Sequence, residues 1–531
     1  MNRLRQTSPR LTQIVRVVVR HKFIGVLRGK GHWPSPQEVR KTFEELGLVF
    51  IKFGQILALR RDLLPDAYIT ELEQLQDQLP TVAFAEIRET VETELGASLE
   101  QLFASFSETP LAAATIAQVH VATMQDGRPV VVKVQRPGLR AQISTDIAAL
   151  AYLAALGERL SPRLRTLGPA RMVQEFAESL RQEIDFGREA RSIRRFRTSM
   201  AEIENLWIPD FIGERSSTRV LTMDHSYGER LDRYVSTHPE SKSGCIDTFV
   251  KVMLRSIFEV GFFHADPHPG NLFVLPDGRV CLHDFGNMGE LDETMRDSLS
   301  RMLAASVGGD ARAATDGYLE IAKAGDDLDR PALQADIAAI LRDMKARAEA
   351  QISIGDALTS LLRAGSRHGV RSPRDFFLLT RAFVITESLL SQLDPQFNFT
   401  KALREEMIRA NEQRRTPARL LKTWSKVFQD VERLANDAPI DTHRILRRIA
   451  EGDLGRLRVP EMEHKIRNIS RDLERLTGGV VVAALIIGGS MLEMVSRGGW
   501  LGFIGRAMLS IGLIGALIIA IGAWLRFRRN P

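Results

Sequence analysis

The pattern of apolar and polar positions divides the chain into a helical N-terminal part, a short strand-rich stretch and a long helical remainder. Strand-like runs of β-branched residues appear at Gln118 to Met124, Val130 to Gln135 and around Arg219 to Met223. An Asp126-Gly127 turn between the first two runs predicts a β-hairpin. Helical spacing predicts helices over a stretch ending at Pro80, about 84–107, about 139–205, and Gly244 to Phe263. This mixture predicts an α+β fold.

The N-terminal end is basic and amphipathic. Residues 1–30 carry basic side chains and no acidic one, and apolar residues recur at helical spacing from Leu11 to Val18. Such a helix can lie on an anionic membrane surface. It can equally pack on its own domain, and the pattern leaves both interpretations open. A cleaved signal peptide is not indicated, because Arg16 and Arg20 interrupt any apolar core.

Two long apolar runs lie at the C-terminal end, Gly478 to Val495 and Ala507 to Leu525. Each is close to the minimum length that spans the hydrocarbon of a bilayer, and a short polar turn separates them, so they predict a transmembrane hairpin over 478–525. Arginines follow the second run and favour a cytoplasmic C-terminus. A two-pass hairpin then leaves the large domain on that same side. Buried core helices are the alternative interpretation of both runs.

Length and charge exclude some classes of function. With 531 residues the chain can form two or three folded units, and its net charge of +6 fits a solvated surface with some membrane attraction. No cluster of aromatic and basic residues indicates nucleic acid binding. The two cysteines, Cys245 and Cys281, offer neither a disulfide framework nor a metal cluster, which favours a reducing compartment.

The residues with the most specific chemistry lie between Phe263 and Gly286. Asn271 follows Asp266 by five residues, and Asp284-Phe285-Gly286 begins thirteen residues later. Protein kinases use this spacing: one carboxylate faces the acceptor oxygen, while an Asn and the DFG Asp bind the Mg²⁺ that bridges the phosphates. Oxygen ligands on two adjacent loops suit this hard cation. We therefore predict that Asp266 is catalytic and that Asn271 and Asp284 bind Mg²⁺.

Two further features fit a nucleotide site. Lys133 interrupts an apolar strand, as does the kinase lysine that reaches the α/β-phosphates and pairs with a helix Glu. That partner is expected within 171–200, where Glu183 and Glu189 are both candidates. Where a kinase carries a Gly-rich loop, this chain has Ala112-Ala113-Ala114-Thr115. Alanine keeps the backbone further from phosphates than glycine does, which predicts altered nucleotide geometry or selectivity.

Other interpretations of the same region are weaker. His264, Asp266 and His268 could form the HxDxH cluster of a metal hydrolase, but that reading leaves the Asn and DFG spacing unexplained. Two absences argue against ordinary protein phosphorylation. Ala265 stands where kinases regulated by activation-loop phosphorylation have Arg, and no Ala-Pro-Glu follows Gly286.

Several motifs join these residues in sequence order: LGLVFIKFGQILALRRDLLP with Lys52-Phe53-Gly54-Gln55, then AAAT, VVVKVQRPG, QEIDFGREA, HADPHPGN and DFG. With this set the chain resembles the UbiB-type atypical kinase-like family, ATPases associated with ubiquinone biosynthesis. The resemblance covers about residues 35–400, and the predicted C-terminal helices fit the bacterial members. Thr115 replaces the serine that commonly ends the alanine motif, a mild departure.

The resemblance implies a bilobal protein-kinase-like fold that uses ATP and Mg²⁺. It implies that Lys133 contacts the phosphates and pairs with Glu189, and that Lys52 meets Glu183 and Asp185 in the active site and blocks the place of a peptide. The implied site residues are, for catalysis, Asp266, Lys52, Glu183 and Asp185, and, for the nucleotide, Ala112, Ala113, Ala114, Thr115, Lys133, Glu189 and Asp224.

The implied function is a membrane-anchored ATPase that supports ubiquinone biosynthesis at the bacterial inner membrane. Its expected partners are quinone precursors or membrane lipids and other enzymes of the pathway, and a homo-oligomer is compatible with it. Two alternatives stay open: a phosphotransferase acting on a protein or lipid, and a non-catalytic nucleotide-binding scaffold. The expected order is a basic segment (1–34), a helical extension (35–110), an N-lobe (111–222), a C-lobe (223–400), a charged stalk (401–477) and two transmembrane helices (478–525).

Overall fold

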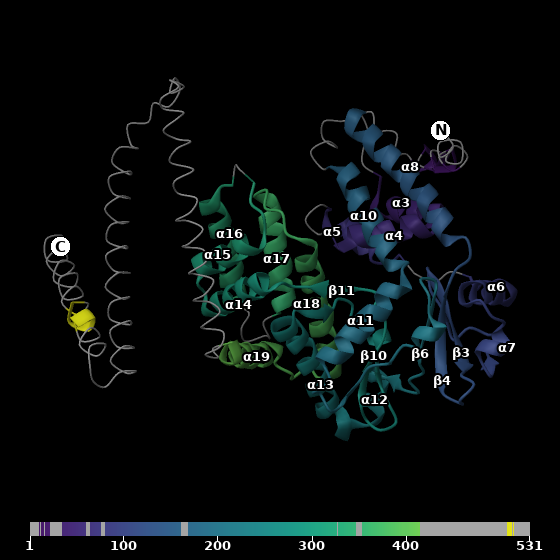
Figure 1. Ribbon diagram of the computed structural model, residues 1–531. Coiled ribbons are helices and arrows are strands. Elements are labelled where there is room, and N and C mark those ends of the chain that lie inside the picture. Colours follow the sequence, from purple (N-terminus) through teal and green to yellow (C-terminus); the bar gives the residue numbers. More distant parts are fainter. Residues whose placement is uncertain are drawn as a thin grey trace. The chain divides into compact units, whose positions relative to one another are not determined.

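The computed structural model describes residues 10–21 except 11, 15 and 18, then 34–59, 64–75, 80–160, 168–325, 328–346, 353–414, 507–511 and 513. The chain separates into two compact units, Met1–Thr416 and Pro417–Pro531. The first unit holds every helix and strand discussed below (Figure 1). Most of the predicted stalk and apolar hairpin, and residues 22–33 of the basic segment, lie outside the described residues.

The helical extension combines segments that are distant in sequence. Helix α3 (Pro36–Leu46) begins with a capping box between Ser35 and Glu38, as Ser35-Pro36-Gln37-Glu38 leads one to expect. Helices α4 (Leu48–Leu59) and α5 (Asp66–Leu72) follow. Helices α8 (Leu139–Leu160) and α10 (Pro169–Glu183) return to α4, and the three share one apolar cluster (Figure 1).

The N-terminal basic segment packs on this extension. Ile14 and Val17 are buried in the same apolar cluster. The guanidinium of Arg10 lies 2.6 Å from a carboxylate oxygen of Asp146 on α8. Of the two interpretations that the sequence left open, packing of the apolar face on its own domain is therefore the one that the structure supports for the described residues.

The N-lobe contains an antiparallel sheet in the order β1-β3-β4-β6, with β2 paired to β3. Its strands are β1 (Ser105–Phe106), β2 (Ala112–Ala113), β3 (Ala117–Thr123), β4 (Pro129–Gln135) and β6 (Val220–Asp224). Strands β3 and β4 confirm the predicted hairpin. The helix predicted over 84–107 is wrong at its end: α6 (Phe84–Leu95) stops at Gly96 in the left-handed region, a short α7 (Leu99–Leu102) follows, and β1 pairs with β3.

The helices predicted across about 139–205 are confirmed as α8, α10 and a further helix, α11 (Phe186–Ser199). The helix predicted from Gly244 to Phe263 ends earlier. Helix α13 (Lys242–Arg255) continues as a π-helical turn to Val260 and stops at Gly261, which has a φ of 72°. Strand β8 (Phe262–His264) then leads into the catalytic loop. This early end gives the chain its extended approach to Asp266.

The C-lobe carries two small sheets and a helical domain. One sheet has the order β5-β10-β9-β7, and β11 pairs with β8 in the other. The remaining elements are β5 (Leu206–Trp207), β7 (Glu229–Arg230), α12 (Leu231–Thr237), β9 (Leu272–Val274), β10 (Val280–Leu282), β11 (Met288–Glu290), α14 (Glu293–Gly308), α15 (Ala311–Ile321), α16 (Arg330–Ala346), α17 (Ile354–Arg367), α18 (Arg374–Leu393) and α19 (Phe399–Arg414).

Helix α18 is a core helix of the C-lobe. Among the described residues it is the one helix that is long and apolar enough to cross a membrane, but half of its apolar window is buried in the fold. Phe376 and Phe383 belong to the main apolar core. The carboxylate of Glu387 accepts hydrogen bonds from the backbone N–H groups of Ile354 and Gly355, which caps α17. Burial in the core thus accounts for the apolar character of α18.

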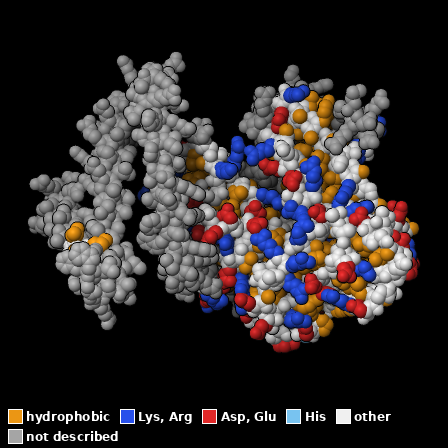
Figure 2. All heavy atoms as spheres, in the orientation of Figure 1, with side chains coloured by type: hydrophobic (Ala, Val, Ile, Leu, Met, Phe, Trp, Pro, Cys, Tyr) orange, Lys and Arg blue, Asp and Glu red, His pale blue; other side chains and the backbone are white. Residues whose placement is uncertain are grey.

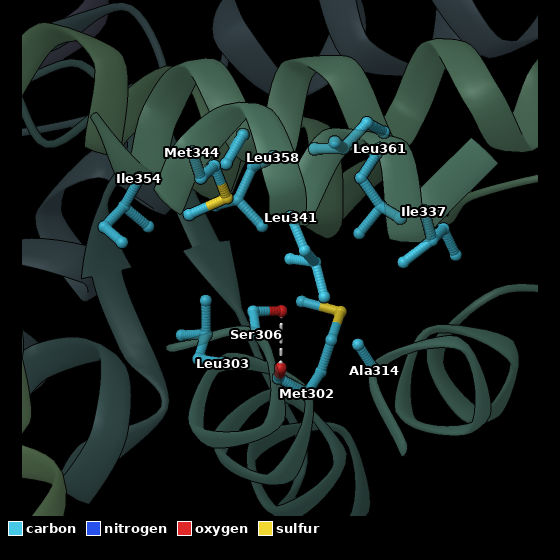
Figure 3. A pocket seen from close by; sticks show the side chains of 12 residues that line it. Met302, Leu303, Ser306, Ala314, Ile337, Leu341, Met344, Ile354, Leu358 and Leu361 are labelled. Atoms are coloured by element: carbon cyan, nitrogen blue, oxygen red, sulfur yellow. Dashed lines mark hydrogen bonds between the residues drawn. The ribbon is translucent and has the colours of Figure 1, made fainter. Parts of the chain in front are cut away.

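A small apolar cavity of about 30 Å³ lies among α14, α15, α16 and α17 (Figure 3). Met302, Leu341 and Leu358 are among its lining residues. The hydroxyl of Ser306 also lines it but donates to the Met302 carbonyl at 2.7 Å. The cavity shares no residue with the sequence motifs and is therefore not part of the predicted nucleotide site.

The surface charge is mixed in sign. Figure 2 shows basic and acidic side chains interspersed over the visible face of the first unit. Exposed ion pairs include Arg195 with Glu290 at 2.7 Å and Arg171 with Glu175 at 2.9 Å. This distribution fits the solvated surface that the composition predicts.

Candidate active site

A buried ion pair between strand β4 and helix α11 forms the centre of the candidate site. The ammonium of Lys133 on β4 donates to both carboxylate oxygens of Glu189 on α11, at 2.9 and 2.8 Å. The side chain of Glu189 is only 4% exposed. Although burial opposes the charge of Lys133, the carboxylates of Glu189 and Asp284 raise the pKa of Lys133 above its ordinary value. The structure thus pairs Lys133 with Glu189 and leaves Glu183 to another partner.

Local sequence explains how the pair is positioned. Helix α10 ends at Glu183, and Asp185 caps the start of α11, because its side chain accepts from the Gly187 N–H at 3.0 Å. The buried ring of Phe186 lies 5.3 Å from the Lys133 ammonium. On β4, Gln135 donates to the carbonyl of Ile184 at 2.7 Å and holds the strand against the turn between the two helices.

Asp284 completes the cluster from the C-lobe. Its carboxylate lies 3.6 Å from the Lys133 ammonium. It is the one described non-glycine residue with a positive φ, 57°, a conformation that costs free energy and is commonly found at functional sites. The positive charge of Lys133 lowers the pKa of Asp284 to about 2. Since its side chain is 54% exposed, a ligand can reach an ionised carboxylate.

The catalytic loop is held by a hydrogen-bonded histidine. The Nδ1 atom of His264 accepts from the Asp266 N–H, and its Nε2 donates to the His283 carbonyl at 2.9 Å. Burial lowers the pKa of His264, which keeps the ring neutral. Because both ring nitrogens are used, His264 cannot serve the predicted alternative of a metal hydrolase, and the described residues contain no group of three His, Cys, Asp or Glu suited to a metal.

Asn271 and Asp266 share this loop. The Asn271 amide donates to the Asp266 carbonyl at 3.1 Å, which leaves its oxygen available to a cation. Strands β9 and β10, which pair in an antiparallel ladder, connect Asn271 to Asp284. One carboxylate oxygen of Asp266 accepts from Arg381 on α18 at 2.9 Å. Sequence reasoning missed Arg381, because no local signal connects residues so far apart in the chain.

Phe285 links the catalytic loop to the N-lobe helix. Its buried ring lies 5.7 Å from His264 and 5.5 Å from Phe196 on α11. Glu189 and Phe196 are therefore fixed by the same helix, one toward Lys133 and the other toward the DFG segment. The sequence motifs do not include Phe196, so they did not predict its contact with Phe285.

The Lys-Phe-Gly-Gln motif of α4 reaches the same cluster. Lys52 lies 2.9 Å from the carboxylate of Glu183, and its positive charge also helps to lower the pKa of Asp284. The Phe53 ring contacts Phe176 of α10 at 5.0 Å. The side-chain amide of Gln55 donates to the Leu75 carbonyl at 3.1 Å. The motif thus directs one charged side chain to the site while its other residues pack the extension.

Gly54 shows how tightly the extension is packed. A Cβ atom at this position would lie 2.4 Å from a side-chain atom of Leu75 and 2.6 Å from one of Phe43. A larger residue therefore requires the Leu75 and Phe43 side chains, or α4 itself, to shift. Close packing therefore explains the glycine between Phe53 and Gln55.

The alanine segment is partly a strand. Ala112 and Ala113 form β2 and pair with Val119 and Gln118 of β3. Val119 in turn pairs with Lys133, so Ala112 lies in the same cross-strand row, about 10 Å away at two strand spacings. The Ala114 carbonyl accepts from Arg136 at 3.0 Å. The segment is therefore fixed on the sheet beside the lysine, and Thr115 at its end is buried.

Asp224 lies at the end of β6, and its carboxylate is used within the protein. It accepts from Arg128 and from the Asp210 N–H, at 2.6 and 3.1 Å. Directly after it, Ser226 forms a hydrogen bond of 2.6 Å with His283. Burial lowers the pKa of His283 to about 4. This contact between Ser226 and His283, which the sequence did not predict, joins the end of β6 to the DFG segment.

The oxygen donors fit the predicted cation. Mg²⁺ usually binds one or two protein oxygens and retains water or phosphate ligands. Asp284 offers an ionised carboxylate and Asn271 an amide oxygen, with Lys133 beside them as a second positive partner for phosphates. Asp284, Asn271 and Lys133 therefore fit Mg²⁺ and a nucleoside triphosphate.

Comparison with known proteins identifies the family of this chain. Residues 74–317 match the ABC1 atypical kinase-like domain, and residues 337–398 match the UbiB helical domain. A Xylella fastidiosa protein named "Probable protein kinase UbiB" is 30% identical over 92% of this chain and 90% of its own length. A protein of the same name from Xanthomonas campestris pv. campestris is 31% identical with the same coverage. A Clostridium pasteurianum protein named "Uncharacterized protein in hydrogenase 1 5'region" is 27% identical over 98% of this chain and 97% of its own. This chain therefore belongs to the UbiB family of ABC1 atypical kinase-like proteins.

Proposed function

We propose that this protein is a membrane-anchored, kinase-like ATPase that supports ubiquinone biosynthesis by handling hydrophobic quinone precursors. The observation that carries the proposal is the meeting of two pairs, Lys52 with Glu183 and Lys133 with Glu189, around Asp284. Lys52 thus brings the helical extension to the proposed ATP site, although phosphoryl transfer in ordinary kinases uses no such extension. Membership of the UbiB family supports the link to ubiquinone.

The chain's own residues have separable tasks in this proposal. Lys133 would contact the phosphates, held in place by Glu189, and Asp266 would orient the attacking water. Asp284 and Asn271 would hold Mg²⁺, which when bound neutralises charge on the phosphates. Lys52 would stand where a peptide acceptor would otherwise enter. Each task uses a contact or an ionisation state described above.

The segment after the DFG motif favours hydrolysis over peptide phosphorylation. Strand β11 follows within two residues of Gly286, and α14 begins at Glu293. Most of the backbone from 287 to 292 thus lies in strand β11 or in the N-cap of α14. This leaves little chain for a platform that would hold a peptide.

The predicted hairpin over 478–525 would anchor the protein in the bacterial inner membrane by two passes, with the large domain in the cytoplasm. Quinone precursors are hydrophobic and reside in the bilayer, so an anchored site would stay close to them. Other enzymes of the pathway would be its partners, and self-association is compatible with this placement.

The test is ATP turnover by the full chain in liposomes that contain a phenolic quinone precursor. Wild type should hydrolyse ATP, and Asp266→Asn and Asp284→Asn should each lower turnover to a small residual rate. Lys52→Met should change the dependence of turnover on the precursor, whereas Lys41→Met, at an exposed position of the same extension, should not. Equal turnover by wild type and Asp284→Asn would refute the proposal.

Two alternatives have their own signatures. Transfer of ³²P to a defined protein or lipid, abolished by Asp266→Asn, would indicate a phosphotransferase. Unchanged quinone levels in an Asp284→Asn strain with preserved protein abundance would indicate a non-catalytic scaffold. Neither outcome is expected from the ATPase proposal.

A further inference from the structure

Helix α18, in the UbiB helical domain, supplies a side chain to the catalytic loop. The Arg381 guanidinium donates to one carboxylate oxygen of Asp266 at 2.9 Å. Within the part of the chain that the structure describes, the other oxygen of Asp266 accepts no hydrogen bond. One oxygen is thus fixed by a charge-assisted hydrogen bond while the second can face an acceptor.

The platform that carries Arg381 is rigid. Thr380 and Ala382, the residues on either side, are buried, and α18 contributes much of the apolar core. A helix packed in this way holds the backbone of Arg381 in one position. The direction of the guanidinium is therefore set by the helical domain and by its contact with Asp266.

A second contact joins α18 to the same loop system. The carboxylate of Asp375, in the first turn of α18, accepts from the Glu290 N–H on β11 at 3.1 Å. Strand β11 pairs with β8, which leads directly into Asp266. Asp375 and Arg381 are six residues apart, about 9 Å along the helix. The helix thus touches both the DFG-side strand and the catalytic carboxylate.

We propose that Arg381 is a positioning residue that orients the Asp266 carboxylate, so that the helical domain completes the active site. The inference rests on the proposed ATP turnover for its main measurement. A partly exposed ion pair makes a small contribution to stability, which a double-mutant cycle can measure, so its main consequence should be orientation. Misplacement of a reacting group by about 1 Å can cost on the order of 10²-fold in rate.

The test is a double-mutant cycle in the full chain. Arg381→Gln should lower kcat about 10- to 100-fold and leave the affinity for Mg·ATP within about twofold, because Lys133 and Asp284 remain. Arg381→Lys, which keeps the charge but loses the planar fork, should recover part of the rate. Arg367→Gln removes an exposed arginine that pairs with Asp336 in the same domain and is the matched control.

In the Asp266→Ala background, Arg381→Gln should have almost no further effect on kcat. The melting temperature gives a second, activity-free cycle: Arg381→Gln should lower it more in the wild-type background than in Asp266→Ala. Independent, multiplicative effects on kcat would overturn the inference. If wild type shows no turnover, the proposed function fails, and the melting temperatures decide: coupling supports the positioning role, and equal shifts in both backgrounds overturn it.

Discussion

Replacing Lys133 by methionine should destabilise the kinase-like lobes, because it leaves the Glu189 carboxylate buried without a cation. The Glu189 side chain is 4% exposed, and both of its oxygens accept from Lys133. Removing one partner of a buried pair costs about 3–5 kcal/mol. Since Lys133 is itself 19% exposed, we take the lower end, about 3 kcal/mol. For the first compact unit, Met1–Thr416, an unfolding entropy of about 2.1 cal/mol/K per residue converts this loss to a fall of roughly 3–4 °C in melting temperature.

The loss should grow with pH. Burial raises the pKa of Glu189, and in the variant Lys133 no longer opposes that effect. A carboxyl group whose folded-state pKa exceeds its unfolded value contributes stability that is fully present below the unfolded pKa and is lost as pH rises through the folded pKa. The variant should therefore be closest to wild type in acid and fall behind as the pH rises above the ordinary carboxyl range of about 4–5.

Thermal unfolding of the full chain, followed by fluorescence between about pH 5 and about pH 8, measures both effects. The double variant with Glu189→Gln removes the uncompensated charge and should recover about 2 kcal/mol of the loss. It should also lose the dependence on pH. The reasoning is refuted if Lys133→Met melts like wild type throughout this range, or if the double variant melts no higher than the single one.

Three further predictions, two of them with a matched variant, test the framework of the fold. Asp185→Ala should cost about 1 kcal/mol by removing the cap of α11 and should weaken nucleotide binding in titration calorimetry, whereas Asp185→Asn should restore both. Gly261→Ala should cost more than about 2 kcal/mol, since φ is 72° and a Cβ would lie 2.4 Å from the Leu291 carbonyl oxygen. Gly278→Ala, with φ 86° in open space, should cost about 1 kcal/mol, and equal melting shifts would contradict the clash. Glu387→Ala should speed hydrogen exchange at the start of α17, and unchanged exchange would argue against its capping role.

Local patterns carried much of the prediction. The hairpin of β3 and β4 and the helix start at Ser35 follow from turn and capping chemistry within a few residues. The spacing of Asn271 and Asp284 likewise follows from two short strands between two loops. These features depend on neighbouring residues, so the sequence contains the whole signal.

The sequence failed where tertiary pairing competes with local propensity. The end of the stretch over 84–107 forms β1, because β3 offers it a backbone partner. The basic N-terminal segment buries Ile14 and Val17 on α4, α8 and α10, and no pattern in the segment itself could choose that surface over a membrane. In both cases the deciding partner is distant in the chain.

The sequence by itself determined which chemical groups the site contains: Lys133, Asp266, Asn271 and Asp284 follow from motif and spacing. Only the tertiary structure decided which carboxylate each lysine pairs with. Helix α10 ends at Glu183 and Asp185 caps the start of α11, so Glu183 and Glu189 lie on two different helices and meet Lys52 and Lys133 respectively. The fold likewise brought Arg381 to Asp266. Both are contacts between distant elements, and their geometry depends on helix packing that no local pattern records.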